Sequence, residues 1–135
     1  MICPDTNVLV TYLARTRDPG FPGAAVAMAQ EYVLITPTVL LETEWVLRSA
    51  FRLRRDDILD KLRRLVSLPN VEVASDHAVS RALDWSRESL DLADALHLAS
   101  TPSDVRFVTA DRSLARKARR ISGAPRIDLL QESAT

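Results

Sequence analysis

The sequence is poor in several kinds of residue, and each scarcity excludes something. It contains one cysteine, so no disulfide can form within the chain, and one cysteine with two histidines is too few for a structural zinc site. Aromatic residues make up only 5% of the chain, so a core has to be built from aliphatic side chains. No apolar run approaches the length that a membrane span requires, so we expect no membrane partner.

These absences lead to expectations about the setting of the protein. The length of 135 residues predicts a single domain, residues 1–135, that can bury a core without a disulfide or metal. Cys3 is interpreted as a small core residue. The start of the sequence has no basic segment followed by a long apolar run, and together with the lack of cysteine pairs this predicts a soluble, cytoplasmic protein.

The charge of the chain is informative only in its distribution. The net charge is zero, which by itself gives no case for nucleic acid. All but two of the 18 basic residues are arginines, the exceptions being Lys61 and Lys117. Arginine forks match phosphate oxygens better than lysine does. The arginines gather within residues 48–55, 63–64 and 112–120, although solvated helix faces remain the ordinary interpretation of any one group.

Strand-like and helix-like segments alternate along the chain. Short β-rich apolar runs predict strands at 2–5, 32–35, 71–73, 107–109 and 126–129, and the patterns between them predict helices at about 7–14, 23–31, 37–53, 56–67, 76–86, 91–100 and 112–119. This alternation predicts an α/β fold with a mainly parallel sheet covered on both faces. Such sheets bind ligands beyond the carboxyl ends of their strands. Asp5 and Asp111 follow two of the strands and are expected at that edge.

Two further acids lie on predicted helices without a cation at contact spacing. Glu42 has mainly apolar residues three and four positions away, whereas Glu44 can pair with Arg48. Asp94 likewise has apolar neighbours and His97. Because burial of an unpaired carboxylate is costly, each acid is expected either at a rim or beside a metal.

The ordinary interpretation of each acid is structural. Asp5 and Asp111 are as typical of helix N-caps as of ligands, and Asp91 is typical of an acid at a helix start. Their combination is the unusual feature. Four carboxylates about 5 Å apart would repel by roughly 3 kcal/mol per pair at an effective dielectric of about 20. The set therefore predicts hard cations, Mg²⁺ or Mn²⁺, unless some acids are protonated. Such cations can activate water against a phosphodiester.

The remaining chemistry-bearing residues have less specific interpretations. His97 is interpreted either as a packed residue or as a neighbour that orients the ligands, with a minor role at most. Trp45, Trp85 and Phe51 are spaced with aliphatic residues as on a helix, so core packing is favoured over base stacking.

Four segments together resemble the PIN-domain toxins of the VapC type. They are Asp5-Thr6-Asn7-Val8-Leu9, residues 41–48 with Glu42, residues 92–99 with Asp94, and Phe107-Val108-Thr109-Ala110-Asp111. Each motif is weak alone, but the four occur in order and cover almost the whole chain. The resemblance implies a three-layer α/β/α PIN domain with a mainly parallel central sheet.

The resemblance also implies a function. It indicates an endoribonuclease that needs Mg²⁺ or Mn²⁺ and acts as the toxin of a type II toxin–antitoxin pair. Asp5, Glu42, Asp94 and Asp111 match the acidic quartet by position, and Thr6, Asn7, Asp91 and Thr109 are expected to orient ligands or water around it. Some members carry a further acid where this chain has Ser113, so Asp111 is expected to be a weaker or water-mediated ligand. RNA, a cognate antitoxin and a second copy of the chain are the implied partners.

Two other functions stay open at this point. A phosphoacceptor signalling domain of the flavodoxin-like kind also gathers acids at strand ends around Mg²⁺, but it normally has adjacent acids early in the chain, and Asp5 has no acidic neighbour. A catalytically silent PIN domain could act only through a binding partner. Phosphodonor labelling would identify the first, and metal titration with a cleavage assay would identify the second.

Overall fold

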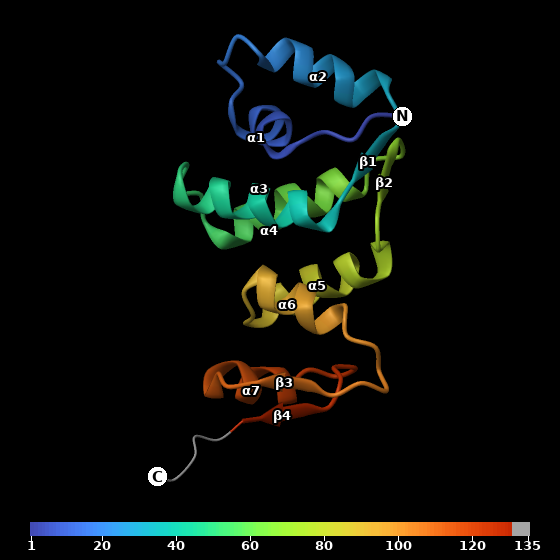
Figure 1. Ribbon diagram of the computed structural model, residues 1–135. Coiled ribbons are helices and arrows are strands. Elements are labelled where there is room, and N and C mark those ends of the chain that lie inside the picture. Colours follow the sequence, from blue (N-terminus) through green and yellow to red (C-terminus); the bar gives the residue numbers. More distant parts are fainter. Residues whose placement is uncertain (131–135) are drawn as a thin grey trace. The chain divides into compact units, whose positions relative to one another are not determined.

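A computed structural model describes residues 1–130, which divide into two compact units (Figure 1). The N-terminal unit is Met1–Asp76, and the C-terminal unit begins at His77. Within the described residues, no helix is both long enough and apolar enough to cross a membrane. Since each unit has its own compact set of contacts, each is described by itself.

The N-terminal unit combines helices with a pair of parallel strands. Its elements are α1 (Thr6–Ala14), α2 (Phe21–Gln30), β1 (Val33–Ile35), α3 (Pro37–Ser49), α4 (Arg55–Val66) and β2 (Val71–Val73). β1 and β2 lie side by side, with Val33 opposite Val71 and Ile35 opposite Val73 (Figure 1). α1 packs against α2 and α3, and α3 also packs against α4.

The predicted strand at residues 2–5 is reduced to one bridge. Ile2 pairs with Val33 in parallel; its backbone N–H donates to the Tyr32 carbonyl at 2.7 Å, and its carbonyl accepts from the Leu34 N–H at 2.8 Å. The pairing stops there because Pro4 has no N–H to donate and Asp5 already caps α1. The prediction of a four-residue strand was therefore wrong in length.

The long helix predicted for residues 37–53 ends earlier, at Ser49. The following backbone turns back on the helix, with the Leu53 N–H donating to the Leu47 carbonyl at 3.1 Å. Arg52 adopts a left-handed conformation, φ 53°, which an α-helix cannot contain. The helix was predicted too long because Phe51 and Leu53 continue its apolar spacing. Both side chains are partly buried although they lie beyond the end of the helix.

The C-terminal unit contains the second parallel pair of strands. Its elements are α5 (Asp76–Glu88), which begins at the last residue of the N-terminal unit, α6 (Leu92–Ala99), β3 (Phe107–Thr109), α7 (Arg112–Arg119) and β4 (Ile127–Leu129). β3 and β4 pair with Phe107 opposite Ile127, and α7 packs on both strands. Gly123 makes the turn before β4 in a left-handed conformation, φ 86°, and its carbonyl accepts from Arg81 Nη2 at 2.5 Å.

Both units have aliphatic cores, as the scarcity of aromatics predicted. The fully buried large side chains are Leu9, Met28, Ile35, Leu47, Ile58, Leu62, Leu65, Leu83, Leu90, Leu98, Val10 and Val33. Trp85 is buried as predicted, at 6% exposure. Trp45 is 58% exposed and Cys3 is also exposed, so both predictions of core positions were wrong. Phe51 is half-buried.

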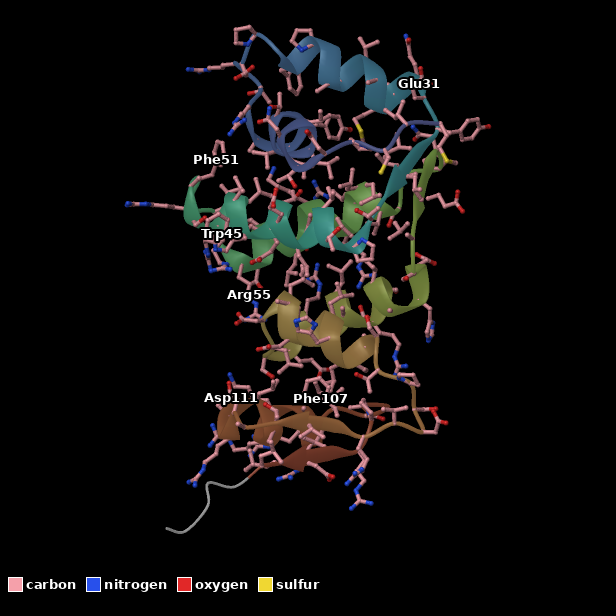
Figure 2. All side chains as sticks on the ribbon, viewed as in Figure 1. Glu31, Trp45, Phe51, Arg55, Phe107 and Asp111 are labelled. Atoms are coloured by element: carbon pink, nitrogen blue, oxygen red, sulfur yellow. The ribbon has the colours of Figure 1, made fainter. Side chains whose placement is uncertain are left out.

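These exceptions have local causes. Trp45 lies on α3 (Figure 2), and the neighbouring positions Thr43 and Leu47, at 0% exposure, are the ones that face the core. Cys3 lies between the bridged Ile2 and Pro4, where the chain leaves the strand pair for α1. Neither position could be assigned from the identity of the residue alone.

Candidate metal centre

Asp5 caps a helix and still has a carboxylate oxygen available for a ligand. It is the N-cap of α1, and its Oδ1 accepts a hydrogen bond from the Val8 backbone N–H at 3.1 Å. Within residues 1–130, its Oδ2 accepts no hydrogen bond. The cap and ligand interpretations are therefore compatible, because capping uses one carboxylate oxygen and leaves the other available.

Asp5 and Glu42 line the same cavity, which has a volume of about 380 Å³. Thr6 and Asn7 from the first turn of α1, and Thr38 and Val39 from α3, complete its walls. None of these lining residues is basic. The contact between α1 and α3 brings the two acids together although they lie far apart in the sequence.

Glu42 is exposed at this cavity, which corresponds to the rim position that its spacing allowed. In the described part of the chain it forms no hydrogen bond or ion pair. Glu44, two positions on, differs as predicted: its Oε1 accepts from Arg48 Nε at 2.9 Å. The two glutamates of α3 thus have separate surroundings, one paired and one facing a cavity.

Asp111 repeats the arrangement of Asp5 in the C-terminal unit. It is the N-cap of α7, where its Oδ1 accepts from the Leu114 N–H at 3.0 Å. Its own N–H donates to Thr109 Oγ1 at 3.0 Å, so Thr109 fixes the backbone that carries the acid. Figure 2 shows Asp111 at the start of α7, and its Oδ2 has no hydrogen-bond partner among residues 1–130.

Asp94, on α6, is the acid with perturbed ionisation. Partial burial, and then the Asp91 carboxylate, raise the pKa of Asp94 above its ordinary range. Asp111 raises this pKa further, whereas the positive charges of His97 and Lys117 lower it. Asp94 and Asp111 are therefore close enough to repel each other. Asp91 occupies the N-cap position of α6 but makes no side-chain capping bond.

The four predicted ligands fall into two pairs, one in each unit. Asp5 and Glu42 share a cavity in the N-terminal unit, and Asp94 and Asp111 interact in the C-terminal unit. Within either unit by itself, residues 1–130 hold no group of three acids, histidines or cysteines able to bind a metal ion. A site with all four acids needs both units, and the meeting of the two pairs stays a prediction.

The chemistry of the donors fits a hard divalent cation. All four candidate ligands are carboxylates. Asp5 and Asp111 each have one oxygen that capping does not use, and Asp94 is repelled by its neighbour Asp111. Hard cations such as Mg²⁺ and Mn²⁺ prefer oxygen ligands of this kind. In the N-terminal pair, no basic side chain of the cavity offers neutralisation instead.

Sequence reasoning placed Thr38 beside Glu42 on one helix but gave it no role, and it missed Lys117 as a neighbour of Asp94. Thr38 lines the cavity of Asp5 and Glu42, and its Oγ1 lies 3.4 Å from that of Thr36. Its position four residues before Glu42 on one helix was a usable signal. Lys117 acts on Asp94 through its charge. The only signal for Lys117 was its place on the helix that Asp111 caps.

Comparison with known proteins identifies the family. The sequence model of the PIN domain matches residues 2–120 and so runs through both units. Neither the curated proteins nor the solved structures gave a match. PIN domains have an α/β fold of the three-layer α/β/α kind, with which the helices and parallel strands agree, and they are generally nucleases that need divalent metals. The chain belongs to the PIN-domain family.

Proposed function

We propose that this protein is an endoribonuclease that depends on Mg²⁺ or Mn²⁺ and uses Asp5, Glu42, Asp94 and Asp111 to hold the metal. The observation that carries the proposal is the cavity shared by Asp5 and Glu42, which has no basic side chain in its walls. An acidic cavity of this kind gains most from a cation supplied from solution. The family assignment supports a phosphodiester as the bond that is broken.

The residues of the chain have defined roles in this reaction. When bound, the cation would lower the pKa of a water molecule and offset negative charge on the phosphodiester. Asp5 and Asp111 would each give it the oxygen that capping leaves available. Thr109 keeps Asp111 in place through the 3.0 Å hydrogen bond to its N–H. Thr6 and Asn7, in the walls of the cavity, would orient ligands or the attacking water.

α7 supports nucleic acid as the substrate. Its apolar side, Leu114, Ala115 and Ala118, is buried, and the rest of the helix is strongly basic. The basic residues of α7 and its C-cap are Arg112, Arg116, Lys117, Arg119 and Arg120. None of them forms an ion pair with a carboxylate within residues 1–130. Unneutralised arginines on the helix that begins at Asp111 are suited to the RNA backbone.

We also propose that the nuclease is the toxin of a type II toxin–antitoxin pair and forms a homodimer. The support is the resemblance of its four motifs to toxins of the VapC type, together with exposed apolar side chains that a partner could cover. Val26, Tyr32 and Trp45 are such residues in the N-terminal unit. A neighbouring short gene for a DNA-binding antitoxin, whose product forms a complex with this chain and blocks its activity, would support the pairing. Growth unaffected by expression of the chain alone would contradict it.

The activity is tested with purified protein, single-stranded RNA and added Mg²⁺ or Mn²⁺. We expect cleavage that EDTA stops and that Asp5→Asn and Asp94→Asn abolish, while the exposed Asp104→Asn control retains it. Asparagine is itself a good N-cap, so Asp5→Asn should keep the fold. Full activity of either variant, in preparations free of contaminating nuclease, would remove the mechanism. Metal binding without cleavage of any RNA would instead indicate a catalytically silent PIN domain.

A further inference from the structure

A second cavity adjoins the acidic cavity within the N-terminal unit. It has a volume of about 360 Å³ and lies between α1 and the start of α2. Its polar side chains are those of Asn7, Thr11, Arg15 and Asp18, and small residues of α2 lie beside them. Asn7 lines both cavities, so the two are neighbours along α1. We call this second cavity the α1–α2 cleft.

Two contacts hold Arg15 in the α1–α2 cleft, and neither of them is with a carboxylate. Its Nη1 donates to Asn7 Oδ1 at 2.6 Å, and its guanidinium carbon lies 5.4 Å from the centroid of the Phe51 ring. Within residues 1–130 it forms no ion pair with a carboxylate. A guanidinium has five N–H donors, and within residues 1–130 that of Arg15 uses one of them. The partly buried Arg15 is thus a positioned cation with donors left for an anion.

We propose that the α1–α2 cleft binds a backbone phosphate of the RNA next to the phosphate that is cleaved, and that Arg15 recognises it. This inference rests on the proposed function, because it takes the Asp5–Glu42 cavity as the place of cleavage. An RNA strand that places one phosphate at that cavity must continue to either side of it. On one side it would pass Asn7 and reach the cleft, where Arg15 offers a planar fork that suits phosphate oxygens.

Asp18 gives the proposal a test with the opposite sign. Its Oδ1 accepts from the Gly20 N–H at 2.7 Å, yet its negative charge also lines the α1–α2 cleft. A phosphate in the cleft is attracted by Arg15 and repelled by Asp18. Asp18→Asn keeps an acceptor for the Gly20 N–H and removes the repulsion. Loss of structure in the cleft would weaken RNA binding in both variants, whereas a bound phosphate predicts opposite changes.

The experiment measures RNA binding without cleavage. The full chain is titrated against a fluorescein-labelled single-stranded RNA in EDTA, by fluorescence anisotropy over a range of salt concentrations. Arg15→Gln should weaken binding roughly fivefold and lower the slope of log K against log salt by about 0.7, as expected for one lost phosphate contact. Arg15→Lys keeps the charge and should keep most of the slope. Asp18→Asn should tighten binding.

The matched control is Arg17→Gln, which removes an exposed arginine two residues away that does not line the cleft. Arg15→Gln and Arg15→Lys both remove the guanidinium that contacts Asn7 and Phe51. If both variants weakened RNA binding equally, the role of Arg15 would be to hold the structure of the cleft, and the proposal would be overturned. Equality of Arg15→Gln with Arg17→Gln would also overturn it. If Arg15→Gln instead affects only the binding of a protein partner, the cleft recognises an acidic side chain and the proposal is wrong.

Cleavage in Mg²⁺, measured in parallel, separates this inference from the proposed function. Cleavage by the unmodified chain with no dependence of RNA binding on Arg15 would overturn the cleft alone. Binding that depends on Arg15 without cleavage would overturn the activity and support the cleft as an RNA-phosphate site. A chain that binds no RNA would overturn both.

Discussion

The two acidic pairs have different electrostatic surroundings. Asp5 and Glu42 line an open cavity whose other polar residues, Thr6, Asn7 and Thr38, carry no charge. Asp111 raises the pKa of Asp94, whereas His97 and Lys117 of the same unit lower it. In the proposed function, the bound cation would therefore supply all the positive charge beside the N-terminal pair, whereas Asp94 of the C-terminal pair already has basic side chains nearby.

The acidic side chains thus lie in two kinds of electrostatic surroundings, and the proposed metal binding would use both. In the N-terminal unit, Asp5 and Glu42 are exposed and form no ion pair within residues 1–130, so no internal ion pair has to be broken when a cation arrives. In the C-terminal unit, partial burial and neighbouring acids raise the pKa of Asp94, and basic side chains limit that rise. We therefore expect the loss of either pair to lower the cleavage rate more than the removal of one acid that belongs to neither pair.

The largest expected effect is on cleavage, and it should be shared by both pairs. Asp5→Asn and Asp94→Asn should each lower the cleavage rate in Mg²⁺ by more than about 100-fold, because each removes a negative ligand and leaves the volume unchanged. Rates are measured at saturating metal with a labelled RNA. If only one of the two variants lost activity, the two pairs would not share one metal centre.

The two tryptophans, one in each unit, should differ in how much they contribute to the free energy of unfolding. Trp85, 6% exposed and with the Arg81 guanidinium carbon 4.7 Å from its ring centroid, packs in the C-terminal unit. Trp85→Ala should lower the free energy of unfolding by about 3–5 kcal/mol. Trp45→Ala should change it by less than about 0.5 kcal/mol, because Trp45 is 58% exposed. Urea unfolding followed by circular dichroism measures both. Equal losses would show that Trp45 is covered in solution, as a homodimer interface would require.

The sequence predicted the local elements better than their limits. The strands at 71–73 and 107–109 and the caps Asp5 and Asp111 were confirmed, because β-rich runs and capping residues act over a few positions. The strand at 2–5 was overestimated because Pro4 interrupts the pairing. The exposure of Trp45 depends on which side of α3 meets α1 and α4, and apolar spacing did not determine that side.

The candidate site was predictable to a similar degree. That Asp5 and Glu42 would approach each other followed from four motifs in the order of a known family, and the cavity that they share is consistent with it. Thr38 was given no role and Lys117 was missed because both are ordinary polar residues on helices. Their relation to the acids depends on how α1 meets α3 and how α7 lies near α6. Arg15 was missed for the same reason, since its contact with Phe51 joins segments far apart in the chain.

Substitutions of Asp111 should have smaller effects, and they separate its role as a helix cap from its proposed role as a metal ligand. Asp111→Ala removes the acceptor of the Leu114 N–H and should destabilise the protein by about 1 kcal/mol, whereas Asp111→Asn keeps a capping group. Because Ser113 replaces a further acid, we expect Asp111→Asn to reduce cleavage less than Asp94→Asn does. Thermal unfolding and cleavage rates are compared for the two variants. A loss of cleavage in Asp111→Asn as large as that of Asp94→Asn would make Asp111 a direct ligand.

The smallest expected effect is the pH dependence of stability without metal. The pKa of Asp94 is raised in the folded chain above its ordinary value of 3.8, so the folded state binds more protons than the unfolded state between those two pKa values. Stability from this group is therefore full at low pH and falls as the pH rises through that window. In EDTA at neutral pH, Asp94→Asn should unfold at a higher denaturant concentration than the unmodified chain, and the gain should vanish below about pH 4. Asp104→Asn, exposed and remote in sequence, serves as the control. A gain that does not depend on pH would mean that asparagine acts through packing or hydrogen bonding, and the charge repulsion around Asp94 would lose its support.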